Sequence, residues 1–218
     1  MTRLSTGEER SHWSRWHDDY DDPGSSLSWR LSVVQQRLRD ALDAAAPGPV
    51  QLLSLCAGQG RDVLDVLAEH SRRRDVQAVL VDSDEANCAY AAETAQQQGL
   101  DVDVRCADAS LTSTYADAVP ADLLLLCGIF GNVSDDDIRH TIDNTARLCA
   151  AGATVLWTRH RKPPDMTVAI REWFAAGGFA EVAFDTREGD AYAAVGTNRL
   201  AAAPQPFDAD LRLFTFLR

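Results

Sequence analysis

The chain has 218 residues and a formal net charge of −12 at pH 7, and 45% of its residues are hydrophobic. This length and composition suit one globular domain with a full core. The acidic balance argues against nucleic acid as a partner, because nucleic-acid-binding proteins usually carry a basic stripe. No apolar run approaches the roughly 20 residues that cross a membrane. We therefore expect no membrane span and, from the polar residues 1–15, no signal peptide.

The cysteine pattern favours a reducing compartment. The chain has five cysteines, an odd number, and no two of them form a Cys-x-x-Cys pair. Such cysteines are typical of reduced thiols rather than of disulfides or zinc sites. We expect a cytoplasmic protein without a bound metal.

The N-terminal part of the chain differs from the rest. Residues 1–27 are polar and rich in aromatic side chains, among them Trp13 and Trp16. From Ser28, apolar residues recur at helical spacing, and this pattern ends before Pro47. We expect a single domain over residues 1–218, in which residues 1–46 form an N-terminal helical cap on a core made by residues 47–218.

After this helix, strand-like apolar runs alternate with helical segments. Such alternation predicts an α/β fold with a doubly wound, mostly parallel sheet, because right-handed crossovers place helices on both faces. The helix after the fourth strand has the clearest start, with Ser134 as N-cap and three aspartates behind it. We expect strands at 50–56, 76–82, 101–106, 122–127, 153–158 and 179–185, and helices at 61–70, 84–98, 134–149 and 166–176.

The turn after the first strand indicates a nucleotide-type ligand. The apolar run 52–55 breaks into a glycine pair, Gly58 and Gly60, and Asp82 closes the next apolar run. A strand, a glycine turn, a helix, a strand and an acid in this order are typical of a fold that holds an adenosine-type cofactor. Glycine lets the backbone approach the ligand, and the acid can accept hydrogen bonds from both ribose hydroxyls.

The details of this turn favour one class of cofactor. A dinucleotide fingerprint requires a third glycine where this chain has Val63, and a P-loop requires a lysine, whereas the only lysine is Lys162. The turn instead resembles motif I of class I S-adenosylmethionine (SAM)-dependent methyltransferases, acid-x-Gly-x-Gly-x-Gly. Gly58 and Gly60 match the second and third glycines, while Ser54 and Cys56 replace the acid and the first glycine.

Two later stretches strengthen the resemblance, which covers about residues 50–160. Residues 106–109 follow the third strand, and the resemblance implies that Asp108 accepts a hydrogen bond from the adenine amino group. Residues 122–128 resemble the fourth strand, beside which the methyl donor lies. The family's sheet has seven strands and ends with an antiparallel strand, for which 191–196 and 211–217 compete; we prefer 211–217.

The resemblance implies SAM as the cofactor and a set of residues that bind it. These residues lie at the carboxyl ends of the predicted strands, where open α/β sheets bind their ligands, or in an N-terminal segment that would cover the cofactor as a lid. They are Tyr20, Arg30, Cys56, Ala57, Gly58, Gly60, Asp82, Ser83, Asp108, Ala109, Cys127 and Gly128.

For the reaction, the resemblance implies methyl transfer to a small-molecule acceptor, most often to oxygen or nitrogen. His17 and His160 are the candidate catalytic residues, since histidine can take up a proton near neutral pH. Asn132, Arg159 and His160 are the candidates for substrate binding. Two alternatives stay open: a non-catalytic SAM- or nucleoside-binding module, and a dinucleotide-dependent oxidoreductase, which Val63 disfavours. The oligomeric state also stays open.

Overall fold

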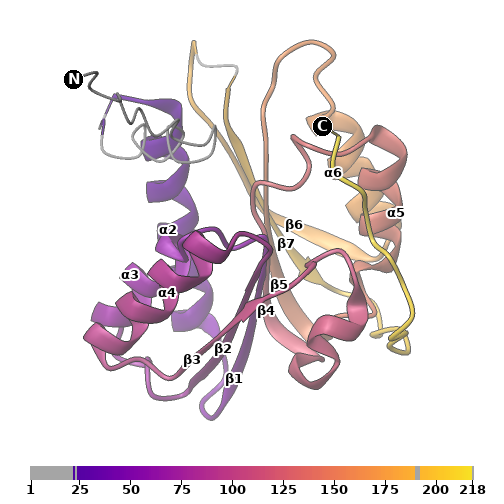
Figure 1. The fold of residues 1–218 in the computed structure, drawn as a ribbon. Helices are drawn as coiled ribbons and strands as arrows, with labels where there is room; N and C mark the ends of the chain where they lie inside the picture. The colour runs from indigo at the N-terminus through magenta and orange to yellow at the C-terminus, as the bar shows by residue number, and fades with distance from the viewer. Residues whose placement is uncertain (1–21, 23, 190–191, 218) are drawn as a thin grey trace, which may run out of the picture.

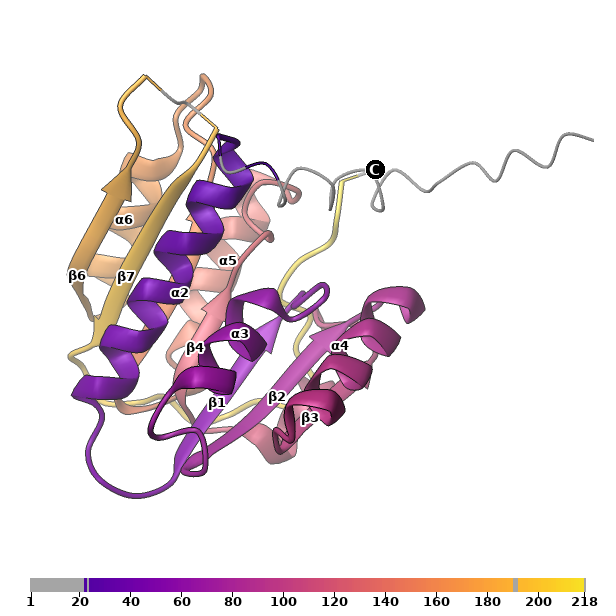
Figure 2. The same ribbon diagram turned by 90° about the vertical axis from the view of Figure 1, so that its left-hand side faces the viewer.

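A computed structural model describes residues 22, 24–189 and 192–217. Seven strands form one sheet in the order β3-β2-β1-β4-β5-β7-β6. Helices cover both of its faces (Figures 1 and 2). The strands are β1 (Val50–Leu55), β2 (Val76–Asp82), β3 (Val102–Cys106), β4 (Ala121–Leu126), β5 (Cys149–Arg159), β6 (Phe179–Thr186) and β7 (Ala194–Leu200).

Two layers of helices flank the sheet, as a doubly wound fold requires. One layer holds α2 (Ser26–Ala44), α3 (Arg61–Glu69) and α4 (Glu85–Gln98), and the other holds α5 (Asp135–Thr145), α6 (Thr167–Ala176) and the 3₁₀ segment η1 (Thr112–Ala118). The central strands β1 and β4 are apolar almost throughout because both of their faces are buried. The α/β architecture and the mostly parallel sheet expected from the sequence are confirmed.

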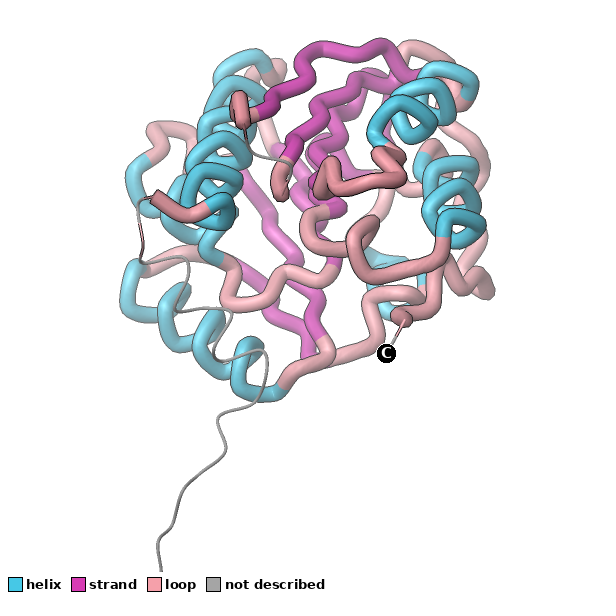
Figure 3. The backbone as a smooth tube through the Cα atoms, turned by 90° about the horizontal axis from the view of Figure 1, so that it is seen from above, coloured by secondary structure: helices cyan, strands magenta, loops and turns pink. Residues whose placement is uncertain are grey.

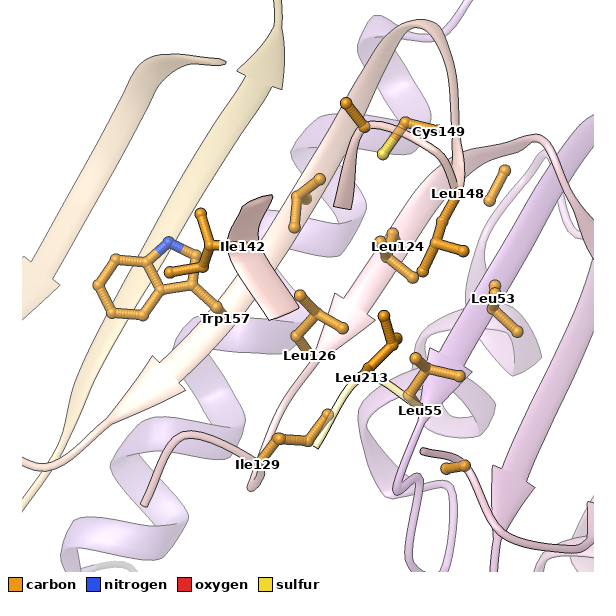
Figure 4. Close-up of a cluster of buried hydrophobic side chains, with 14 of the residues drawn as sticks. Leu53, Leu55, Leu124, Leu126, Ile129, Ile142, Leu148, Cys149, Trp157 and Leu213 are labelled. Atoms are coloured by element: carbon orange, nitrogen blue, oxygen red, sulfur yellow. The ribbon is translucent and has the colours of Figure 1, made fainter. Parts of the chain in front are cut away.

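The hydrophobic core is divided by the sheet. On the α5 side, leucines of β1 and β4 pack with Ile142 and Trp157 (Figure 4). On the α2 side, Leu38 and Leu42 pack with α3 and the opposite faces of the same strands. Each layer of helices therefore has its own cluster of buried side chains.

The preferred position of the antiparallel strand, 211–217, is wrong. The antiparallel strand is instead β7, which pairs with β5 and with β6. Its polar residues made it a weak strand in sequence, but they are needed by Trp157, whose Nε1–H donates to Asn198 Oδ1 at 2.8 Å. Residues 211–217 instead run as a strap along the α5 side of the sheet, where Leu213 packs with Leu55 and Leu126 (Figure 4), held by isolated bridges from Arg212 to Leu111 and from Phe216 to Val133.

Capping contacts explain where several helices begin and end. Ser25 and Ser134 cap α2 and α5 by accepting backbone N–H bonds, and Asp84 caps α4 in the same way. At the end of α2, the guanidinium of Arg72 donates to the carbonyl oxygens of Leu42, Ala45, Ala46 and Gly48. These bonds satisfy carbonyl groups that a helix end leaves unpaired.

No helix within the described ranges is long and apolar enough to cross a membrane. The division into a cap of residues 1–46 and a core stays a prediction, since residues 1–21 and 23 lie outside the described part.

Candidate active site

A cavity of about 1170 Å³ opens at the edge of the sheet where the parallel strands end (Figure 3 views this edge). Its wall draws on α2, on the ends of β1 to β5, on the β6–β7 hairpin and on the strap. The cavity-lining residues predicted from the sequence are Arg30, Cys56, Gly58, Asp82, Ser83, Asp108, Ala109, Gly128, Asn132, Arg159 and His160. The topology thus brings together residues that are up to 130 positions apart.

The turn after β1 has the backbone that its glycines predict. Cys56, Gly58 and Gly60 have φ angles of 55°, 56° and 72°, a region that glycine enters without strain and cysteine rarely adopts. A Cβ atom on Gly60 would lie 2.9 Å from Leu80 Cδ1. The turn therefore lies tightly against β2, with Cys56 and Gly58 on the cavity wall.

Asp82 is fixed beneath this turn. Its Oδ2 accepts the N–H of Gly58 at 2.8 Å, and its Oδ1 accepts the N–H of Asp84 at 3.0 Å. A carboxylate has about four acceptor positions, so Asp82 keeps capacity for ligand hydroxyls. The two backbone bonds hold the carboxylate in one orientation on the cavity wall.

Asp108 has a partner that the sequence did not reveal. Its Oδ2 accepts a bond from Arg212 Nη1 at 3.0 Å, and its Oδ1 accepts the N–H of Ser110 at 2.9 Å. Burial opposes ionisation of Asp108, but the bonds from Ser110 and Arg212 outweigh it and lower the pKa of the carboxyl. No sequence signal links Arg212 to Asp108, because 104 positions separate them.

Three predicted residues lie beneath or beside the cavity rather than among its lining residues. Ala57 and Gly60 shape the turn, where the N–H of Ala57 donates to Val81 O and that of Gly60 to Ala57 O. Cys127 is only 7% exposed. Burial raises the pKa of the Cys127 thiol, and the nearby carboxylate of Asp62 adds to the shift.

Asp62, which the sequence pattern did not single out, is a half-buried acid next to Cys127 and Arg30. Burial raises the pKa of its carboxyl, and the positive charge of Arg30 opposes the shift. Arg30 itself lines the cavity from the first turns of α2. Asp62 is the second residue of α3 and the only acid of its first turn.

The ends of β4 and β5 form the other side of the cavity. The N–H of Gly128 donates to Thr158 Oγ1 at 2.9 Å, and Asn132 Nδ2 donates to the carbonyl oxygen of Gly128 at 2.7 Å. Arg159 Nη1 donates to the carbonyl oxygen of Phe130. These bonds hold the two strand ends in register with each other.

His160 follows directly on this side. Its Nδ1 is buried without a hydrogen-bond partner among the described residues. Burial lowers the pKa of the imidazole, and the charges of Arg159 and Lys162 lower it further. His160 is therefore neutral at physiological pH.

Further cavity-lining residues were not found from the sequence. Lys162 Nζ lies 3.8 Å from the centroid of the Tyr192 ring, and both line the cavity. Phe216 and Leu217 of the strap line it as well. The other two predicted residues, His17 and Tyr20, lie outside the described residues. Among the described residues, no group of three His, Cys, Asp or Glu is placed to hold a metal.

Residues 52–152 match the sequence profile of a family described as "Methyltransferase domain". This segment thus resembles a methyltransferase domain, and the fold described above is that of SAM-dependent methyltransferases. No curated protein sequence matches the chain.

Solved structures share the fold of this methyltransferase domain. Magnesium protoporphyrin IX methyltransferase from Synechocystis PCC 6803 with bound SAM is 14% identical over 87% of this chain and 91% of its own, with a TM-score of 0.62. The 1,6-didemethyltoxoflavin-N1-methyltransferase of Burkholderia thailandensis is 17% identical over 93% of each chain, also with a TM-score of 0.62. The CurJ carbon methyltransferase is 14% identical with a TM-score of 0.61; the match covers 81% of this chain but only 55% of that one.

SAM is the cofactor of this family, and the cavity fits it. Asp82 is held with free acceptor capacity beside the glycine turn, and Asp108 and Ala109 lie at the end of the neighbouring strand. On the opposite wall, Arg30 supplies a positive charge that suits a carboxylate. These residues would hold the ribose, the adenine and the amino-acid end of the cofactor.

Proposed function

We propose that this protein transfers a methyl group from SAM to a small-molecule acceptor, at an oxygen or nitrogen atom. The observation that carries the proposal is the extent of the cavity, which runs without a break from Asp82 to Arg159. Its volume of about 1170 Å³ exceeds the range of roughly 300–1000 Å³ that is usual for one small ligand. A cofactor and an acceptor can therefore lie in it together.

Bound SAM supplies an activated methyl group on a sulfonium centre. The chain supplies alignment and a pocket from which water is excluded, which are the main requirements of an in-line transfer. The ends of β4 and β5, tied to each other through Gly128 and Thr158, form the floor on which donor and acceptor meet.

His160 is our candidate for the group that takes the acceptor's proton. A neutral imidazole keeps a lone pair for this purpose, and burial together with Arg159 and Lys162 keeps His160 neutral. Asn132 and Arg159 are proposed to position the acceptor. His17 is a second candidate base, about which the described residues say nothing.

The small-molecule class of acceptor is supported by two observations. The fold neighbours named above are described as acting on magnesium protoporphyrin IX and on 1,6-didemethyltoxoflavin. The net charge of −12 disfavours nucleic acid.

Transfer from SAM that carries an isotopically labelled methyl group tests the proposal. Incubated with a broad panel of small hydroxyl- and amino-bearing acceptors, the protein should form labelled products and S-adenosylhomocysteine (SAH). Binding of SAM without transfer to any acceptor would instead favour the non-catalytic SAM-binding module.

A further inference from the structure

The charges on the cavity wall are separated. Asp82 and Asp108 follow β2 and β3, whereas Arg159 and Lys162 follow β5 on the other side. The chain has a net charge of −12, so two cations on one side of a cavity are opposite in sign to the charge of the molecule as a whole. The local field therefore attracts an anion to the β5 side, although the molecule as a whole repels one.

Neither cation forms a direct ion pair within the described part of the chain, and Asp135 and Asp165 act on Arg159 only through their more distant charges. Arg159 bonds only the carbonyl oxygen of Phe130, and its Nε is buried without a hydrogen-bond partner there. The ammonium of Lys162 lies on the ring of Tyr192. Between them, Arg161 is paired with Asp165 at 3.2 Å. Burial lowers the pKa of Arg159 despite the charges of Asp135 and Asp165, so its positive charge is not fully compensated and a bound anion would offset the cost.

An apolar surface lies beside these cations. Tyr192, Phe216 and Leu217 are 62%, 44% and 64% exposed, and all three line the cavity. They are three of the six exposed large hydrophobic side chains in the described part of the chain. Apolar side chains gathered at a cavity mouth mark a binding surface for an apolar group.

We infer that the acceptor is an amphipathic organic anion, with an acidic group and an aromatic body. The acidic group pairs with Arg159 and Lys162. The aromatic body packs against Tyr192, Phe216 and Leu217. This inference rests on the proposed function, whose acceptor it specifies.

The carboxylate of the cofactor is the other anion that these cations could meet. We assign that carboxylate to Arg30, which lies near Asp62 in the first turn of α3, directly after the glycine turn. Arg159 and Lys162 remain for the anion of the acceptor, and the measurement of SAH affinity below separates the two assignments.

Paired probes test the inference. With SAH present at saturation, calorimetry compares 2-naphthoate with its neutral analogue 2-naphthamide, and with acetate, which has no apolar body. The protein should bind naphthoate at least roughly 10-fold more tightly than either, the range of one charge-assisted hydrogen bond. Lys162→Gln and Arg159→Lys should each reduce this preference, whereas Arg161→Gln, the same loss of charge in the same loop, should leave it unchanged.

Several results would overturn the inference. One is equal affinity for naphthoate and naphthamide. Another is an equal loss in Arg161→Gln, which would show a general charge effect. A third is a loss of SAH affinity in Lys162→Gln with naphthoate binding unchanged, which would assign the cation to the cofactor. The same titrations are run without SAH, so failure of SAH binding alone would contradict the proposed function and leave the preference for the anion measurable.

Discussion

At the scale of single residues, the site depends on a few groups whose surroundings fix both orientation and charge. Asp82 has two backbone donors, whereas His160 has a buried nitrogen without any partner among the described residues. The first arrangement suits a constant role in binding. The second suits a group that changes its protonation state.

Asp82→Ala should weaken SAM binding roughly 10- to 100-fold, because hydrogen bonds to a charged group contribute about 1.5–3 kcal/mol. Titration calorimetry measures this change. Asp101→Ala removes an exposed acid from the loop before β3 and serves as the control with unchanged affinity. If Asp82→Ala bound SAM within twofold of the unaltered protein, Asp82 would not be the ribose ligand.

The pKa of His160 predicts a pH dependence of stability. Its pKa is lowered in the folded protein by burial and by Arg159 and Lys162, and raised only in part by Asp165. The unfolded chain therefore binds the proton more tightly. The stabilisation is fully present above the ordinary value of about 6.5, and it is lost as the pH falls through the lower folded value.

Urea unfolding of the unaltered protein and of His160→Gln at pH values from 7.5 down to 5 measures this effect. The free energy of unfolding should fall more steeply with acid in the unaltered protein than in His160→Gln. His140→Gln, a change at an exposed helical position of α5, should keep the original slope. Parallel curves for all three proteins would show that His160 is not perturbed.

At the scale of elements, a comparison of two glycines distinguishes the free-energy cost of backbone strain from that of overpacking. Gly60 and Gly99 have similar φ angles, 72° and 64°, but a Cβ atom would meet Leu80 and Leu64 only at Gly60. Gly99→Ala should cost about 1–2 kcal/mol from the left-handed backbone alone. Gly60→Ala should cost about 1–3 kcal/mol more, because the added atom overpacks the turn. Equal losses in denaturant unfolding would mean that the turn after β1 is not packed against β2 as described.

Gly196 in β7 has even less room for a side chain than Gly60. A Cβ atom on Gly196 would lie 2.0 Å from Trp157 Cε2. Gly196→Ala should destabilise the fold by about 3 kcal/mol or more, and Trp157→Leu should remove most of this additional cost. A double-mutant cycle in urea measures the coupling, and strict additivity would contradict the packing of Trp157 on β7.

The elements also show what the sequence could predict. The alternation of apolar runs predicted six strands, most clearly β1, β2 and β4, because strands buried on both faces keep a nearly continuous apolar run. β7 was not predicted well, because two of its residues are poor strand formers that contact Trp157. Gly196 leaves room for the Trp157 ring, and Asn198 accepts the Nε1–H of Trp157. The strap 211–217 has a strand-like sequence because Leu213 and Phe214 are buried, but it packs them into the core on the α5 side without joining the sheet.

At the scale of the whole molecule, the topology assembles the site from distant positions. Motifs in β1 and β2 predicted the cofactor side, since short-range turns create it. The acceptor side could not be predicted equally well. Lys162, Tyr192 and Phe216 come from three separate loops, which only the folded sheet brings to one cavity.

The central claim is that this cavity binds SAM, and titration calorimetry with SAM tests it most directly. We predict saturable binding with one ligand per chain, competition by SAH, and a loss of roughly 10-fold or more in Asp82→Ala. NAD should not bind. Binding of NAD in place of SAM, or SAM affinity that is unchanged in Asp82→Ala, would contradict the account.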